Sequence, residues 1–88
     1  MQFEFKPGCF YKEKDGKVTA EVTFTTKNGV MAINHTFVDE SLRGRGIAGK
    51  LMLAVVDYAQ TNDLQIKPVC SYSQAFFERR PEYDDLLV

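Results

Sequence analysis

The spacing of apolar residues changes once along this chain, near residue 47, and that change limits the folds open to it. Across residues 17–26 apolar and polar side chains alternate, and a period of two predicts a half-buried β-strand. After residue 46 apolar side chains recur every three or four residues, which predicts a helix with a wide apolar face. That face consists of Ile47, Ala48, Leu51, Met52, Val55, Val56 and Ala59. Strands followed by helix predict an α+β fold.

Short turn sequences divide the first 38 residues into antiparallel strands. Asp15-Gly16 and Asn28-Gly29 fit two-residue hairpin turns, in which both residues take positive φ. Residues 3–5 begin an extended segment, and further strands are predicted at residues 9–14, 17–26 and 30–38. Residues 30–38 are apolar at both alternating sets of positions, which predicts a central strand covered on both faces.

The second half of the chain is expected to add a strand and a last helix. The first helix should end near residue 62, and residues 64–70 form a short strand. Because a helix connects it to residues 30–38, that strand should be parallel to them, with a right-handed crossover. Ser71 or Ser73 is expected to cap a helix that runs to about residue 79, before Pro81. All these elements fit one domain over residues 1–88.

Charge and cysteine content exclude several classes of function. The net charge of −1 over 88 residues lacks the basic excess of a general nucleic-acid or anionic-membrane binder. No apolar run approaches the roughly 18–20 residues of a membrane span, and residues 1–7 do not read as a signal peptide. Cys9 and Cys70 form no disulfide framework, so free thiols and a cytoplasmic location are expected. One histidine and two distant cysteines predict no metal site.

A glycine-rich loop at residues 39–46 joins a predicted strand to a predicted helix. Glycines let the backbone approach a ligand, and the helix start offers unpaired N–H groups with a partial positive charge. Arg43, Arg45 and Lys50 add positive charge nearby. This arrangement predicts an anion site, most naturally for phosphate.

Several interpretations of this loop are compatible with its sequence. Gly44-x-Gly46-x-x-Gly49 matches the dinucleotide fingerprint, but the turn starts too far from its strand and no acidic residue follows the next strand. Gly44-x-x-x-x-Gly49-Lys50 approaches a P-loop, but Leu51 replaces the Ser or Thr that holds Mg²⁺. The third interpretation is an ordinary helix start with glycines for chain reversal.

A further pattern, Arg43-x-x-Gly46-x-Ala48 after Val38, resembles motif A of the GCN5-related N-acetyltransferases (GNAT). The rest of the chain is similar to the small single-domain GCN5-like subfamily in four short stretches. These are His35-Thr36-x-Val38, Leu42-Arg43-Gly44-Arg45-Gly46, Cys70-x-Tyr72 and Arg80-Pro81-Glu82-Tyr83. The resemblance implies a GNAT-like fold with antiparallel N-terminal strands, a central strand, a pyrophosphate loop, a crossover helix, a splayed parallel strand and a short C-terminal helix.

The resemblance also implies acetyl-CoA as the bound co-substrate. Phe37 and Val38 would offer backbone groups to the pantetheine arm, and Lys50 or Arg45 would approach the adenosine 3′-phosphate. Ser73 and Phe77 occupy the regions where larger relatives carry an Asn that contacts CoA and a Tyr near its sulfur. The residues expected at the pyrophosphate are Arg43, Gly44, Arg45, Gly46, Ile47 and Ala48.

Three side chains are candidates for the chemistry of acetyl transfer, each with a structural alternative. His35 is either a general base or a hydrogen-bonded histidine of the apolar core. Cys70 is either a thiolate that accepts the acetyl group or a small buried hydrophobe. Tyr72 is an acid or a pocket wall, or it serves packing.

The resemblance therefore implies an N-acetyltransferase that moves an acetyl group from acetyl-CoA to an unidentified amine, either a small molecule or a protein. A second hypothesis is an acetyl-CoA-binding or sensing module with little turnover, including one that acetylates itself at Cys70. A third is a plain α+β interaction domain. A thin core and exposed edge strands are compatible with a monomer or a weak homodimer.

Overall fold

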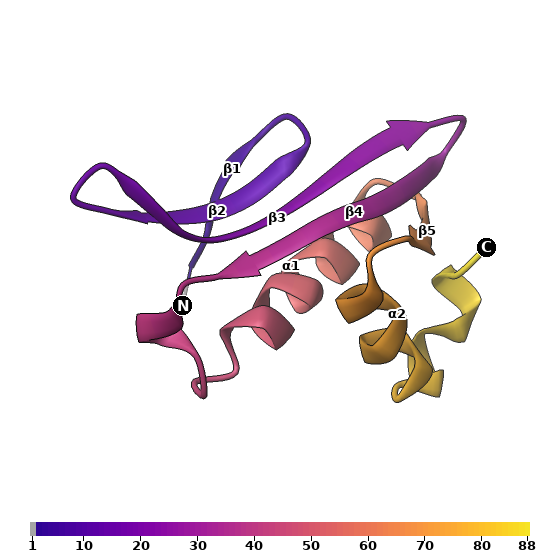
Figure 1. Cartoon of the computed structure of the whole chain (residues 1–88). Helices are drawn as coiled ribbons and strands as arrows, with labels where there is room; N and C mark the ends of the chain where they lie inside the picture. Colours follow the sequence, from indigo (N-terminus) through magenta and orange to yellow (C-terminus); the bar gives the residue numbers. More distant parts are fainter. Residues whose placement is uncertain (1) are drawn as a thin grey trace.

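A computed structural model describes residues 2–88 of the chain, so Met1 of the predicted domain lies outside the described residues. Five strands form one sheet in the order β1-β2-β3-β4-β5, and Figure 1 shows both α-helices on the same side of it. The strands are β1 (Glu4–Lys6), β2 (Cys9–Lys14), β3 (Lys17–Lys27), β4 (Val30–Val38) and β5 (Gln65–Pro68). The helices are α1 (Ile47–Thr61), α2 (Ser71–Glu78) and the 3₁₀ segments η1 (Glu40–Leu42) and η2 (Pro81–Leu86). The predicted α+β fold is confirmed.

The two hairpin turns form where the sequence predicts them. Asp15 and Gly16 have φ values of 53° and 78°, and Asn28 and Gly29 have 52° and 77°. Positive φ at both central residues is the requirement of a type I′ turn. The antiparallel pairing of β2 with β3 and of β3 with β4 follows from these turns.

The prediction that β4 is covered on both faces is wrong. Met31 and Ile33 are buried, whereas Asn34 and His35 are exposed, because both helices lie on one side of the sheet. In the β3–β4 ladder, the consecutive β3 residues Thr23 and Phe24 pair with His35 and Ile33. Asn34, which lies between these two partners, has no ladder partner in β3 and is therefore an additional residue in β4. Such a bulge changes which face the following side chains occupy.

The bulge explains the unusual apolar pattern of β4. Before it, Met31 and Ile33 face the helices; after it, Thr36 and Val38 do. Apolar residues therefore fall on both alternating sets of positions, although only one face of the strand is covered.

The core lies between the sheet and the two helices. The predicted apolar face of α1 is confirmed, since six of its seven residues are buried and Ala48 is half-buried. The buried side chains that complete the core from the sheet and from α2 are Ala20, Val22, Phe24, Met31, Ile33, Ile66, Phe76 and Phe77.

The C-terminal third differs from the prediction in three details. The strand β5 is shorter than residues 64–70, although its parallel pairing with β4 is confirmed. The N-cap of α2 is Cys70, so the predicted capping by Ser71 or Ser73 is wrong. After Pro81 the chain continues as η2, and Leu87 forms a parallel bridge with Ile66 at the edge of β5.

Candidate functional site

The strands β4 and β5 separate at the level of Ile33. Their ladder pairs Val30 to Ile33 with Gln65 to Pro68, and the N–H groups of Val69 and Cys70 then both donate to the Ile33 carbonyl oxygen (3.0 Å each). Beyond this point the chain turns into α2, so the second half of β4 has no β5 neighbour in the described ladder. The predicted splay of the parallel strand is confirmed, and it opens the sheet beside Thr36 to Val38.

The glycine loop presents its backbone at the end of β4. Gly44 and Gly46 take φ values of 83° and 70°, and a Cβ atom built on either would meet no atom within 4 Å. Gly46 is the N-cap of α1 and supplies no side-chain hydrogen bond. The first N–H groups of α1 therefore receive no hydrogen bond from a capping side chain, and they lie at the positive end of the helix dipole.

The segment before the loop is held by hydrogen bonds of its own. The Asp39 carboxylate accepts from the Ser41 N–H (3.0 Å) and from the Ser41 hydroxyl (2.5 Å), and these two bonds lower the pKa of Asp39. Arg43 Nε donates to the Val38 carbonyl oxygen (3.2 Å). The loop is therefore tied back to the last residue of β4.

A cavity of about 210 Å³ lies at the start of α1. The glycine loop lines it from one side, Val38 closes the sheet side, and Tyr72 of α2 faces them. The lining residues are Val38, Leu42, Arg43, Gly44, Gly46, Ile47, Ala48, Gly49 and Tyr72. The structure thus brings six of the predicted cofactor residues together with Tyr72.

Cys70 lies where β5 ends, on the helix side of the opening. Its Sγ is 3.2 Å from Ser73 Oγ and 3.5 Å from Thr36 Oγ1, and Thr36 belongs to the half of β4 that has no β5 neighbour. Burial raises the pKa of the thiol, but its hydrogen bonding with the Ser73 and Thr36 side chains and with the N–H groups of Ser73 and Tyr72 outweighs that effect. The pKa of Cys70 is lowered as a result, which favours the thiolate at the N-terminus of α2.

Cys9 provides the opposite case within the same chain. Both cysteines are free, but Cys9 is buried in β2. Burial and the neighbouring Glu21 carboxylate raise the pKa of Cys9, although Lys6 partly opposes them. The pKa values of the two thiols are therefore shifted in opposite directions, downward at Cys70 and upward at Cys9.

His35 is not placed beside Cys70. It is exposed and lies opposite Thr23, whose neighbours Val22 and Phe24 face the helices. Since directly opposed residues share a face, His35 lies on the face of the sheet away from the helices. The alternative of a core histidine is wrong, and the role of His35 as a base stays a prediction.

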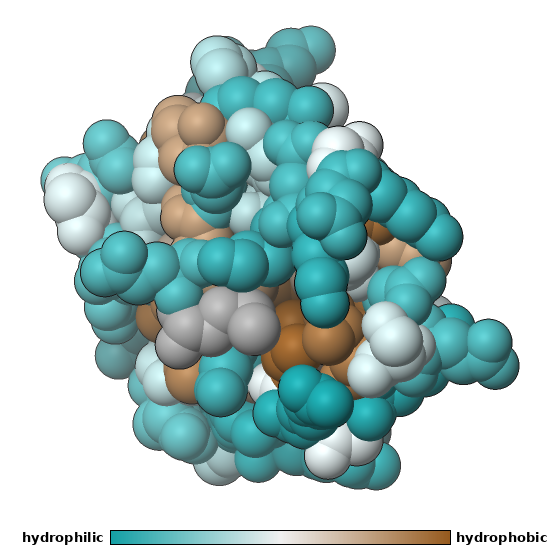
Figure 2. Space-filling model, turned by 90° about the vertical axis from the view of Figure 1, so that its left-hand side faces the viewer, coloured by the Kyte–Doolittle hydropathy of each residue, from teal (hydrophilic) through white to brown (hydrophobic). Residues whose placement is uncertain are grey.

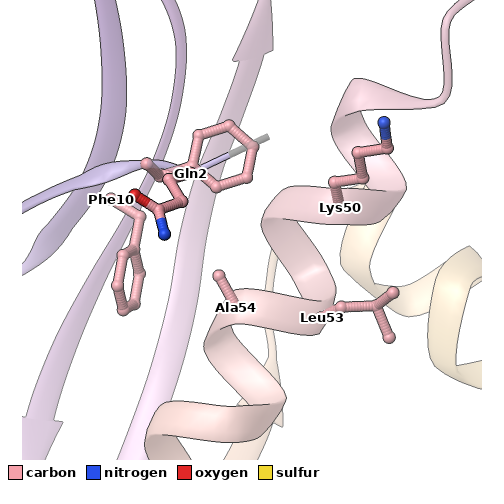
Figure 3. Close-up of a pocket in the computed structure, with 6 residues that line it drawn as sticks. Gln2, Phe10, Lys50, Leu53 and Ala54 are labelled. Atoms are coloured by element: carbon pink, nitrogen blue, oxygen red, sulfur yellow. The ribbon is translucent and has the colours of Figure 1, made fainter.

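The remaining predicted cofactor residues lie outside this cavity. Lys50 lines a separate apolar cavity of about 530 Å³ between α1 and the N-terminal strands, where Figure 3 shows it beside Leu53 and Ala54, across from Phe10. Ser73 and Phe77 are buried, which favours packing roles, and a direct contact with a cofactor stays a prediction for both.

Three residues at the site were not predicted. Leu42 and Gly49 line the cavity, and Thr36 contacts Cys70. The sequence signal for Gly49 was its place in the pattern Gly44-x-Gly46-x-x-Gly49, and a Cβ there would make an ordinary van der Waals contact with the Tyr72 hydroxyl at 3.8 Å. Thr36 belongs to the stretch His35-Thr36-x-Val38, but its contact with Cys70 was not predicted, because the bulge at Asn34 turns its side chain toward the helices.

Residues 2–88 lack the features of a metal centre and of a membrane-spanning helix. Within that range, no group of three or more His, Cys, Asp or Glu side chains is arranged to hold a metal ion. No helix there combines the length and the hydropathy that crossing a bilayer requires.

Comparisons with known proteins agree with this geometry. The family model described as GCN5-related N-acetyl-transferase matches residues 9–86. Protein NATD1 of Bos taurus is 36% identical over 52 residues, and Protein NATD1 of Homo sapiens is 35% identical over 52 residues. Each match covers 59% of this chain and 46% of the relative, so the chain spans about half the length of these curated relatives.

Solved structures give a similar result. A GCN5-like protein from Staphylococcus aureus, determined by NMR, superposes with a TM-score of 0.82 and 30% identity over 99% of this chain and 87% of that one. N-acetylglutamate synthase from Neisseria gonorrhoeae, solved with coenzyme A and N-acetyl-glutamate, superposes with a TM-score of 0.67. Its identity is 16%, over 83% of this chain and 18% of that one, so this likeness concerns the fold alone.

Proposed function

The chain belongs to the GCN5-related N-acetyltransferase family, and we propose that it binds acetyl-CoA and transfers the acetyl group to an amine. The acceptor in this proposal is a small molecule or a protein side chain. The observation that carries the proposal is the cavity of about 210 Å³ in which the free start of α1 meets the opening between β4 and β5.

Each part of acetyl-CoA has a chemically suited place in this proposal. The pyrophosphate would accept hydrogen bonds from the N–H groups at the start of α1, with Arg43 beside it. The pantetheine arm would follow the half of β4 that has no β5 neighbour and use backbone groups of Phe37 and Val38. The thioester would then come near Cys70 and Thr36, where the strands separate.

Transfer to an amine needs positioning more than covalent help from the protein. The unprotonated nitrogen attacks the thioester carbonyl and the C–N bond forms. The C–S bond then breaks, the proton of the attacking nitrogen passes to a base, and CoA leaves as a thiolate that takes up a proton. An acceptor could approach from the face of the sheet that carries His35, since no helix covers that face. We propose His35 as the base and Tyr72, which lines the cavity, as a hydroxyl donor near the cofactor.

Titration of the purified protein with CoA, followed by thiol release from acetyl-CoA over a panel of amines, tests this proposal. Saturable CoA binding and amine-dependent thiol release are expected. Binding without release would favour an acetyl-CoA-binding or sensing module. A lack of binding at millimolar CoA would reject both functions.

A second candidate function, self-acetylation at Cys70, is favoured by the lowered pKa of that thiol. The Cys70 thiolate would attack the thioester carbonyl, forming an Sγ–C bond as the C–S bond to CoA breaks, and the CoA thiolate would take up a proton. Water or an amine could later release the acetyl group from Cys70.

Intact-mass measurement after incubation with acetyl-CoA should detect one acetyl group on the wild type and none on Cys70→Ala. Because the thiolate is the nucleophile, adduct formation should rise with pH and level off at a lower pH than an ordinary cysteine would require. Cys9→Ala is the matched control and should acetylate as the wild type does, since burial and Glu21 raise the pKa of Cys9. An adduct that persists in Cys70→Ala, or none in the wild type at any pH, would contradict self-acetylation.

A further inference from the structure

A cluster of cationic side chains surrounds a second cavity, separate from the one at the glycine loop. This cavity of about 350 Å³ lies between the end of the β2–β3 hairpin and η1. Its lining combines the cations Lys12, Lys14 and Arg45 with a single carboxylate, Glu13, and is completed by Thr19, Ser41 and Leu42. The chain as a whole has a net charge of −1, so this concentration of positive charge is local.

The cationic cavity lies next to the cavity of the glycine loop. Leu42 lines both cavities, and Arg45 lies between Gly44 and Gly46, which line the loop cavity. The Asp39 N–H donates to the Thr19 carbonyl oxygen (2.7 Å), which holds the start of η1 against β3. In Figure 1 the hairpin, η1 and the start of α1 all lie at the left-hand end of the molecule. Figure 2 shows that end directly, and hydrophilic residues dominate it, with several smaller hydrophobic areas between them.

The donors available in this cavity are charged ones. The Thr19 hydroxyl already donates to the Lys12 carbonyl oxygen (3.2 Å), and the Ser41 hydroxyl already donates to the Asp39 carboxylate. A ligand would therefore be held by two ammonium groups and one guanidinium. This donor set suits a phosphate monoester, whose oxygens accept several charge-assisted hydrogen bonds at once.

We propose that Lys12, Lys14 and Arg45 form a subsite for the 3′-phosphate of CoA, so that the β2–β3 hairpin contributes to recognition of the nucleotide. The proposal rests on the proposed function, since the pyrophosphate at the start of α1 would direct the nucleotide toward this subsite. It also separates Arg45 from Lys50, the two residues predicted near that phosphate. Lys50 lines a cavity on another side of α1, with Gln2, Phe3, Phe10, Leu53 and Ala54 as its uncharged neighbours.

Binding of CoA compared with 3′-dephospho-CoA, measured by isothermal titration calorimetry, tests the subsite. The wild type should bind CoA about tenfold more tightly, because charge-assisted hydrogen bonds to the extra phosphate are lost in the shorter ligand. In the double variant Lys12→Ala/Lys14→Ala the affinity for CoA should fall to that for 3′-dephospho-CoA, whose own affinity should not change. The difference between the ligands should also shrink near 1 M salt, where the Debye length is about 3 Å.

Matched variants complete the design. Lys27→Ala removes an exposed lysine at the β3–β4 hairpin, the other end of β3, and should leave the ratio of the two affinities as in the wild type. Lys14→Ala alone removes an exposed side chain and should also reduce the ratio of the affinities for CoA and 3′-dephospho-CoA. This single variant keeps the subsite testable if the double variant does not fold. Adenosine 3′,5′-bisphosphate should compete with CoA in the wild type and lose that ability in the double variant.

The outcomes separate this proposal from the proposed function. If the wild type binds neither CoA nor 3′-dephospho-CoA, the function itself fails. If it binds both equally, or if the lysine variants keep the wild-type ratio, CoA binding holds and the subsite is rejected. The subsite is also rejected if Lys50→Ala loses the preference for CoA over 3′-dephospho-CoA while Lys14→Ala keeps it. That result would place the phosphate on the other side of α1.

Discussion

Gly46→Glu should weaken CoA binding by at least about a hundredfold. The new carboxylate would lie at the N-cap of α1, where the pyrophosphate needs free N–H groups and the positive end of the helix dipole. Loss of two or more charge-assisted hydrogen bonds, each of about 1.5–3 kcal/mol, accounts for an effect of this size. Isothermal titration calorimetry with CoA measures it directly.

The control for Gly46→Glu must introduce the same backbone strain at a position outside the proposed pyrophosphate site. Gly29→Glu does so, because Gly29 has a φ of 77° against 70° at Gly46, and a Cβ at either position would meet no atom within 4 Å. Gly29 lies in the β3–β4 turn, so its variant should bind CoA normally. Gly46→Gln separates bulk from charge and should bind CoA better than Gly46→Glu. Wild-type affinity in Gly46→Glu would reject the loop as the pyrophosphate site.

Phe77→Ala should lower the free energy of unfolding by about 3–5 kcal/mol, the usual cost of truncating a fully packed phenylalanine. Phe77 is 2% exposed, and its ring packs edge-on against Phe76 (5.0 Å between centroids) and Tyr83 (6.2 Å). Since a small domain is stable by about 5–15 kcal/mol, this loss is a large share of the total. Chemical denaturation followed by circular dichroism measures it.

Phe5→Ala provides the comparison, because Phe5 is 48% exposed and its truncation should cost clearly less than that of Phe77. Stability and CoA affinity measured on Phe77→Ala also decide whether Phe77 is a cofactor contact or a core residue. An unchanged free energy of unfolding together with lost CoA affinity would make Phe77 a cofactor contact, as its sequence position predicts. Lower stability with near-normal CoA affinity in the folded fraction would make it a core residue.

The elements that could be predicted from the sequence are those that nearby residues control. The Asn28-Gly29 pair forms a type I′ turn because both residues tolerate positive φ. The helix α1 occupies Ile47–Thr61 because the apolar spacing of those residues matches one helical face. The glycine loop between β4 and α1 was recognisable for the same reason, since its free N–H groups follow from a helix start without a capping side chain.

Features that depend on pairing between distant segments could not be predicted. The bulge at Asn34 arises from the register of β3 against β4, and it turns Thr36 toward Cys70. The separation of Arg45 and Lys50 into different cavities arises from how the hairpin and β1 pack around α1. Local backbone preferences act over a few residues, whereas strand register and helix packing come from contacts between residues tens of positions apart, which a linear pattern does not record.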